Sequence, residues 1–125
     1  VKPAEDVAIL PYRRMVEHAL GAASLLEGQG ISARVVDMRW VKPIDKEAIR
    51  KAAETKLVVT VEDGVIIGGA GEAVSEVLGE EELKVDSLTL GIPDEFIEQG
   101  KVDLLFADLG LDAAGIARQI QDRLV

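Results

Sequence analysis

The sequence of 125 residues contains no cysteine and only one histidine, His18. Without cysteine there can be no disulfide framework, no thiolate metal site and no cysteine nucleophile. A single histidine also excludes the usual multi-histidine metal centres. No apolar run is long enough to span a membrane, and no signal peptide opens the chain. These absences predict a cytoplasmic protein with no membrane partner.

Basic residues are scarce in the second half of the chain. Residues 1–60 hold ten Lys and Arg against eight Asp and Glu, whereas residues 61–125 hold four against fifteen. The two halves therefore carry net charges of +2 and −11. Such an acidic half repels phosphate backbones, so nucleic acid is not an expected partner. The acidic run 80–82 is interpreted as a solvated loop, because a calcium loop needs alternating ligands and turn residues.

Short apolar segments alternate with segments of helical spacing. Strands are predicted where the apolar residues are contiguous, over 7–10, 31–38, 57–61 and 85–90. Helices are predicted over 14–26, over 45–54, from Ala70 to Leu78, and from Asp112 onward. The apolar stripe of the first helix consists of Val16, Ala19, Leu20, Ala23 and Leu26. Asp45 and Asp112 are suitable N-caps, each beside an apolar staple pair. Pro93, Gly100 and Gly110 punctuate short helical pieces.

The strand predicted over 57–61 is apolar on both of its alternating faces, which is typical of a central parallel strand covered by helices. Helices between short strands imply right-handed parallel crossovers. The fold class is therefore α/β, a three-layer α/β/α sandwich around a mainly parallel sheet. The sheet has four strands, or five if the segment near Val65–Ile67 adds an edge strand. Length and the absence of a linker indicate one domain over residues 1–125.

Ligands and partners of an open parallel sheet lie at the carboxyl ends of its strands. The segment Glu62-Asp63-Gly64 leads there into Gly68-Gly69-Ala70-Gly71. Bare amides at a helix start can hold an anion, but Glu62, Asp63 and Glu72 oppose phosphate, and neither phosphate-loop pattern is present. The favoured interpretation is that the glycines let a helix or a neighbouring domain pack closely.

Three other features are candidates for functional residues. Adjacent strand residues point to opposite faces, so Glu62 and Asp63 are interpreted as a partner-domain contact and not as an acid/base pair. Trp40 suits an interface anchor or a cover for the core edge. His18 lies outside the apolar stripe, on a face expected to be solvated, and Arg13-Arg14 could bind a carboxylate or phosphate. No catalytic, metal or cofactor-binding set is complete.

Whole stretches resemble a known superfamily. Residues 35–45 and 58–64, followed by 68–74, resemble the C-terminal domain shared by transketolases and thiamine-dependent 2-oxoacid dehydrogenase beta subunits. Residues 90–100 and 109–117 are similar to the end of the 1-deoxy-D-xylulose-5-phosphate synthase family. Nearly the whole chain is covered.

The resemblance implies a third domain of a longer homodimeric chain. The synthase family joins pyruvate to glyceraldehyde 3-phosphate, with loss of carbon dioxide, on thiamine diphosphate and Mg²⁺, and supplies isoprenoid precursors. Its cofactor site lies between the first two domains, so this domain alone is expected to bind no cofactor and to be inactive. Its expected partners are the other domains of the same chain and a second subunit. The candidate interface residues are Trp40, Glu62, Asp63, Gly68, Gly69 and Gly71.

The chain departs from the synthase pattern at four positions. Arg13 and Arg14 stand where the family has glycine and a small residue, Gln99 where it has histidine, and Val102 where it has arginine. The alternatives are the matching domain of a transketolase or of a 2-oxoacid dehydrogenase beta subunit, and a free-standing α/β interaction module.

Overall fold

The computed structural model describes residues 6–12, 15–36, 46–65, 70–92 and 111–124. Its elements are β1 (Val7–Pro11), α1 (Val16–Glu27), β2 (Ala33–Val35), α2 (Lys46–Ala52), β3 (Leu57–Val65), α3 (Ala70–Glu80), β4 (Asp86–Ile92) and α5 (Ala113–Leu124). Each predicted strand and each main predicted helix is confirmed, with boundaries shifted by a few residues. The helical pieces predicted around Pro93, Gly100 and Gly110 lie outside the described residues, as does the Asp45 cap.

The four strands form one sheet in the order β2-β1-β3-β4, and every neighbouring pair is parallel. Val65 does not begin a separate edge strand, as one alternative allowed. It continues β3 and pairs with Ile92 of β4 after a shift in register beyond Val61. The described part of the sheet therefore has four strands.

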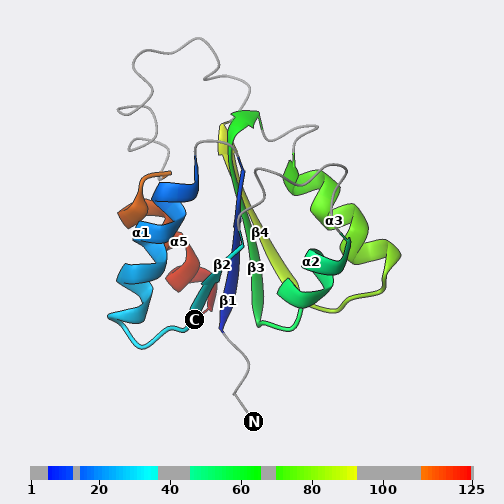
Figure 1. The fold of residues 1–125 in the computed structure, drawn as a ribbon, viewed down its shortest axis with the longest axis horizontal. Coiled ribbons are helices and arrows are strands. Elements are labelled where there is room, and N and C mark those ends of the chain that lie inside the picture. The colour runs from blue at the N-terminus through cyan, green and yellow to red at the C-terminus, as the bar shows by residue number, and fades with distance from the viewer. Residues whose placement is uncertain (1–5, 13–14, 37–45, 66–69, 93–110, 125) are drawn as a thin grey trace.

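Helices cover both faces of this sheet, with α1 and α5 on one side and α2 and α3 on the other (Figure 1). In β1, Val7 and Ile9 belong to the cluster under α1 and α5, whereas Ala8 and Leu10 belong to the cluster under α2 and α3. We call these clusters the α1/α5 core and the α2/α3 core. Because successive strand residues point to opposite faces, a strand covered on both sides is apolar at every position. The predicted three-layer sandwich is confirmed.

The buried stripe of α1 differs at one position from the predicted one. Ala19, Ala22, Ala23 and Leu26 are buried, but Leu20 is 53% exposed. Leu20 lies about 100° around the helix from Ala19, which takes it off the sheet. On another side of the helix, a Cβ built on Gly21 would lie 2.8 Å from Ala113 Cβ, so α1 and α5 pack with their backbones close together.

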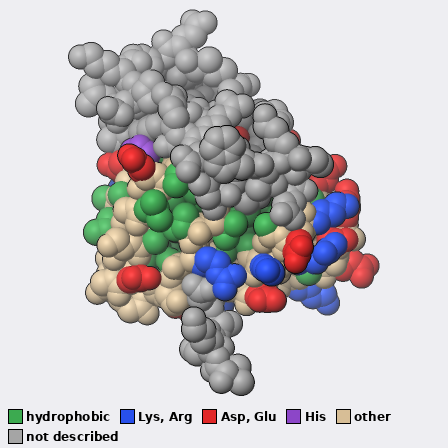
Figure 2. Space-filling view, in the orientation of Figure 1, with side chains coloured by type: hydrophobic (Ala, Val, Ile, Leu, Met, Phe, Trp, Pro, Cys, Tyr) green, Lys and Arg blue, Asp and Glu red, His purple; other side chains and the backbone are tan. Residues whose placement is uncertain are grey.

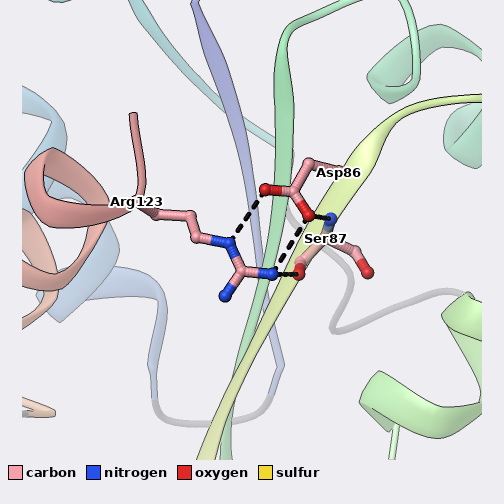
Figure 3. A network of polar contacts seen from close by, with 3 residues as sticks. All are labelled: Asp86, Ser87 and Arg123. Carbon is pink, nitrogen blue, oxygen red and sulfur yellow. Dashed lines mark hydrogen bonds and ion pairs between the residues drawn. The ribbon is translucent and has the colours of Figure 1, made fainter. Parts of the chain in front are cut away.

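Both ends of α5 are fixed. Asp112 Oδ1 accepts a hydrogen bond from the Gly115 N–H at 2.9 Å, which confirms the predicted N-cap. At the other end, Arg123 Nε donates to Asp86 Oδ2 at 2.8 Å, and Nη2 donates to Asp86 Oδ1 at 3.0 Å and to the Ser87 carbonyl at 3.1 Å (Figure 3). The hydrogen bonds from Arg123 lower the pKa of the Asp86 carboxyl. This clamp joins the end of α5 to the start of β4.

The acidic run 80–82 is less isolated than its interpretation as a solvated loop implied. Glu80 is the last residue of α3, and its Oε2 lies 3.7 Å from Lys46 Nζ. Glu81 Oε1 accepts a hydrogen bond from Arg50 Nε at 2.6 Å. The run therefore tethers the end of α3 to α2 through surface ion pairs, which individually add little stability.

Among the described residues, no helix combines the length and the apolar composition needed to cross a membrane.

Candidate functional site

The carboxyl ends of β1 and β3 lie side by side. Tyr12 follows β1, and its N–H donates a hydrogen bond of 2.8 Å to the Val61 carbonyl of β3. The Tyr12 side chain packs against the α2/α3 core. It thus lies on the sheet face that α2 and α3 cover, at the end where the strands stop.

Two polar residues of β3 occupy the same face. Val58 belongs to the α2/α3 core, so the alternation of strand side chains places Thr60 and Glu62 on that face as well. Thr60 is 3% exposed and Glu62 is 7% exposed. Burial, and secondly the Glu62 carboxylate, raise the pKa of Tyr12 to about 12. The phenol of Tyr12 therefore lies close to Glu62 and stays neutral at physiological pH.

The first turn of α3 lies directly on the sheet at this point. A Cβ built on Gly71 would lie 2.9 Å from Thr60 Oγ1 and 2.8 Å from Thr89 Oγ1, which is closer than real Cβ contacts come. Thr60 and Thr89 are paired across β3 and β4. Glycine at position 71 lets the helix approach both strands, and the close approach is made within this chain.

Together these residues form a packed polar cluster, which we call the edge cluster: Tyr12, Thr60, Glu62, Gly71 and Thr89. Within the described chain, the buried Thr60 Oγ1 and Tyr12 Oη make no hydrogen bond. The same part of the chain contains no group of three or more His, Cys, Asp and Glu residues that could hold a metal ion. Among the described residues, the start of α3 lies directly against both strands at Gly71, as in a packing contact.

A groove of about 290 Å³ lies elsewhere, between β2 and α2. Its described lining consists of Arg34, Val36, Glu47, Ala48 and Lys51. None of these residues belongs to the edge cluster, so the groove does not extend the candidate site.

The structure places only some of the residues that the sequence singled out. Glu62 and Gly71 come together in the edge cluster, and both are buried within the chain. Asp63 belongs to β3, and its side chain lies outside what the structure describes. The other candidates lie outside the described residues altogether: Arg13, Arg14, Trp40, Gly68, Gly69, Gln99 and Val102. His18 is half-buried on α1, which differs from the solvated face expected for it.

Sequence reasoning missed Tyr12, Thr60 and Thr89 as parts of this cluster. A signal for one of them was present, because Thr60 and Glu62 are polar residues two positions apart in a strand that is otherwise apolar. Tyr12 directly follows a predicted strand, so its place at the carboxyl edge could be expected from the sequence. Its position in the cluster, and that of Thr89, depends on the pairing of β1 and β4 with β3.

Comparison with known proteins identifies the domain. Residues 1–116 match the family model "Transketolase, C-terminal domain". The chain belongs to the transketolase C-terminal domain family. Among solved structures, this transketolase C-terminal domain is similar to a split-gene transketolase in an inactive β4 tetramer, with a TM-score of 0.86, 41% identity, and coverage of 98% of this chain and 40% of that one. The transketolase of Campylobacter jejuni shares the fold, with a TM-score of 0.69, 20% identity, and coverage of 97% of this chain and 17% of that one.

The curated relatives of this transketolase C-terminal domain all have the name of one particular enzyme in the comparisons below. The 1-deoxy-D-xylulose-5-phosphate synthase of Alcanivorax borkumensis is 56% identical over 120 residues, which are 95% of this chain and 18% of the synthase. That of Chromobacterium violaceum is 49% identical over 121 residues, 96% of this chain and 19% of the synthase. The chain thus spans about a fifth of the length of the curated relatives it matches, and the resemblance inferred from the motifs is confirmed for the domain.

Proposed function

We propose that this chain is the C-terminal domain of a 1-deoxy-D-xylulose-5-phosphate synthase. That cytoplasmic enzyme joins pyruvate to glyceraldehyde 3-phosphate with loss of carbon dioxide, and it supplies isoprenoid precursors. The observation that carries the proposal is the 56% identity to a synthase over 120 residues. Identity at this level spans the whole domain and is not confined to one motif.

In this proposal the domain has a packing role and is inactive alone. Thiamine diphosphate and Mg²⁺, which the enzyme uses for its decarboxylation chemistry, would be held by other domains. The described residues do not fit them, because they contain no group that could hold a metal ion and because Gly71 already lies against Thr60 and Thr89. A diphosphate at the start of α3 would also meet the negative charges of Glu62 and Glu72.

The carboxyl edge of the sheet is the proposed interface with the other domains of the same chain and with a second subunit. Its proposed residues are Trp40, Glu62, Asp63, Gly68, Gly69 and Gly71. Gly71 would act indirectly, by bringing α3 down onto the sheet so that the turn before it can meet another backbone. Glu62 is buried, so it would contribute to the interface from inside the domain, through its position beside Tyr12.

A domain exchange tests the identity. This chain would replace the corresponding segment of the Alcanivorax borkumensis synthase, and the formation of 1-deoxy-D-xylulose 5-phosphate from pyruvate and glyceraldehyde 3-phosphate would be measured. We expect activity within about tenfold of the parent, because the replaced interfaces belong to closely similar sequences. The matched control is the same exchange with the domain of Campylobacter jejuni transketolase, which should give an inactive or unassembled protein.

A transketolase is the second candidate, favoured by the 41% identity to the split-gene transketolase. If this chain restored transketolase assembly but not synthase assembly, the synthase proposal would be wrong.

A substitution in the parent protein tests the interface. Gly69→Leu should weaken dimerisation or domain docking, measured by sedimentation, before it alters affinity for thiamine diphosphate, measured by calorimetry. Intact assembly together with lost cofactor binding would assign the turn to the cofactor site.

A further inference from the structure

Strand β4 forms one edge of the described sheet. Among the described residues it pairs with β3 alone, and it lies at the opposite end of the sheet from β2. Residues 87–92 of this strand contain no charged side chain. A strand of low charge at a sheet edge is prone to pair with another strand, because its unpaired main-chain groups form a ready template. A feature that closes this edge is therefore expected.

The main-chain groups of Ser87 show which way the start of β4 faces. The Ser87 N–H donates a hydrogen bond of 3.0 Å to Asp86 Oδ1, so it is not used in the ladder with β3. In a strand, the N–H and the C=O of one residue point to the same side. Both groups of Ser87 therefore point away from β3, toward the side on which a further strand would pair. This edge lies apart from the exposed face in Figure 2, where apolar side chains gather over α1.

The Asp86–Arg123 clamp occupies both of these main-chain groups. The Asp86 carboxylate accepts the hydrogen bond from the Ser87 N–H, and Arg123 Nη2 donates to the Ser87 carbonyl at 3.1 Å (Figure 3). The same guanidinium holds the carboxylate in place, through Nε at 2.8 Å and through Nη2 at 3.0 Å. The two side chains thus take the places that the C=O and N–H groups of a neighbouring strand would take.

The clamp also fills the space beside the strand. Paired strands lie about 4.7–4.9 Å apart, and the guanidinium already lies within hydrogen-bond distance of the Ser87 carbonyl. A partner strand would have to displace the guanidinium and bury a carboxylate, which is unfavourable. The side chains of Arg123 and Asp86 are 45% and 52% exposed, so solvent screens their attraction and the ion pair adds little stability. Closing the edge accounts for this arrangement better than stabilising the fold does.

We propose that the Asp86–Arg123 clamp is an autoinhibitory contact that keeps β4 from pairing with β4 of a second copy of this chain. The second copy is the relevant partner because two identical edge strands can pair antiparallel about a twofold axis, with the same surface serving both. This edge is distinct from the carboxyl edge, and the inference does not depend on the proposed function.

Sedimentation of the 125-residue chain at a series of concentrations tests the proposal. Arg123→Gln removes the guanidinium and should lower the dissociation constant for self-association by at least about tenfold. The matched control is Arg118→Gln, because Arg118 is an exposed arginine of the same helix and its loss changes the charge equally. This control should leave the dissociation constant unchanged. Urea midpoints of both variants should stay close to that of the unmodified chain, since both side chains are exposed.

A proline shows whether the association uses the β4 edge. Ser87→Pro removes the outward N–H, and proline is tolerated on an edge strand where the missing N–H faces away from the sheet. Added to Arg123→Gln, it should return self-association to the level of the unmodified chain, with circular dichroism confirming that the double variant is folded. Unchanged self-association in Arg123→Gln would overturn the proposal, as would association that Ser87→Pro does not reverse. An unmodified chain whose self-association Ser87→Pro abolishes would also overturn it, because β4 would then pair despite the clamp.

Discussion

On the α1/α5 side of the sheet, the described residues supply fifteen buried apolar residues, whereas on the α2/α3 side they supply eight. The same two strands, β1 and β3, contribute to both cores. The difference lies at the carboxyl end, where the α1/α5 side continues with Val61 and the α2/α3 side continues with Thr60 and Glu62. Among the described side chains of β3, one face therefore stays apolar as far as Val61, and the other ends in the edge cluster. The first supports stability, and the second is the edge proposed above as the interface with other domains.

The largest expected effect is on the hydrocarbon face. Val59 is fully buried in the α1/α5 core. Val59→Asp should prevent folding, because an unpartnered buried carboxylate costs several kcal/mol against a total stability of about 5–15 kcal/mol. Circular dichroism during urea unfolding measures this, with Ser24→Asp on the exposed side of α1 as the control. A variant that unfolds cooperatively near the urea midpoint of the parent would show that the two faces do not differ as described.

The next effect is on the close approach of α3. Gly71→Ala should destabilise the domain by about 1–3 kcal/mol, because the new Cβ would overlap Thr60 and Thr89. In contrast, a Cβ at Gly79 of the same helix meets nothing within 4 Å, so Gly79→Ala should stabilise by about 0.5–1 kcal/mol. Urea midpoints of the two variants give both values.

A second substitution sharpens the Gly71 test. The Cβ that Gly71→Ala introduces would meet the Thr89 Cγ2 methyl first. Thr89→Ser removes that methyl and should restore part of the stability lost in Gly71→Ala. Additive losses in the double variant would mean that the helix reaches the sheet in some other way.

A smaller effect is expected from the buried hydroxyls. The Thr60 Oγ1 is buried with no hydrogen bond in the described chain, so Thr60→Val should be neutral or stabilising by up to about 1 kcal/mol. The buried Thr55 Oγ1 lies 2.7 Å from the Ala52 carbonyl and 3.0 Å from that of Leu57. Thr55→Val should therefore cost about 0.5–1.5 kcal/mol. A loss in Thr60→Val as large as that in Thr55→Val would indicate that the Thr60 hydroxyl does have a partner.

The smallest effect concerns protonation in the edge cluster. Tyr12 is the only tyrosine, so absorbance at alkaline pH reports its ionisation alone. Its midpoint should be about 12 in the folded chain and about 10 in denaturant. Because the folded pKa is the higher one, the associated stability is complete below pH 10 and is lost as the pH rises through 12. Glu62→Gln should lower the folded midpoint while leaving it above 10, since burial is the larger cause. A midpoint near 10 in the folded parent would place the phenol in water.

Much of the fold could be predicted from local patterns. The uninterrupted apolar stretch at 57–61 indicated a strand covered on both faces, and the Asp112 cap marked the start of α5. The sequence also predicted which edge of the sheet carries the candidate residues, because the carboxyl ends of parallel strands meet at the same edge. The spacing of Leu20 is compatible with the buried stripe, and only the placement of α5 and the sheet shows which side of α1 stays exposed.

Local properties of the sequence are sufficient to establish the α/β class, the positions of the strands and helices, and the family. These properties are the period of the apolar residues, the capping groups and a few contiguous motifs. Only the three-dimensional packing establishes that Gly71 lies on Thr60 and Thr89, and that Arg123 clamps Asp86. The physical reason is that these contacts join residues that are distant in the chain. They form only where strand order, parallel pairing and the packing of helices onto each face bring those residues to the same place.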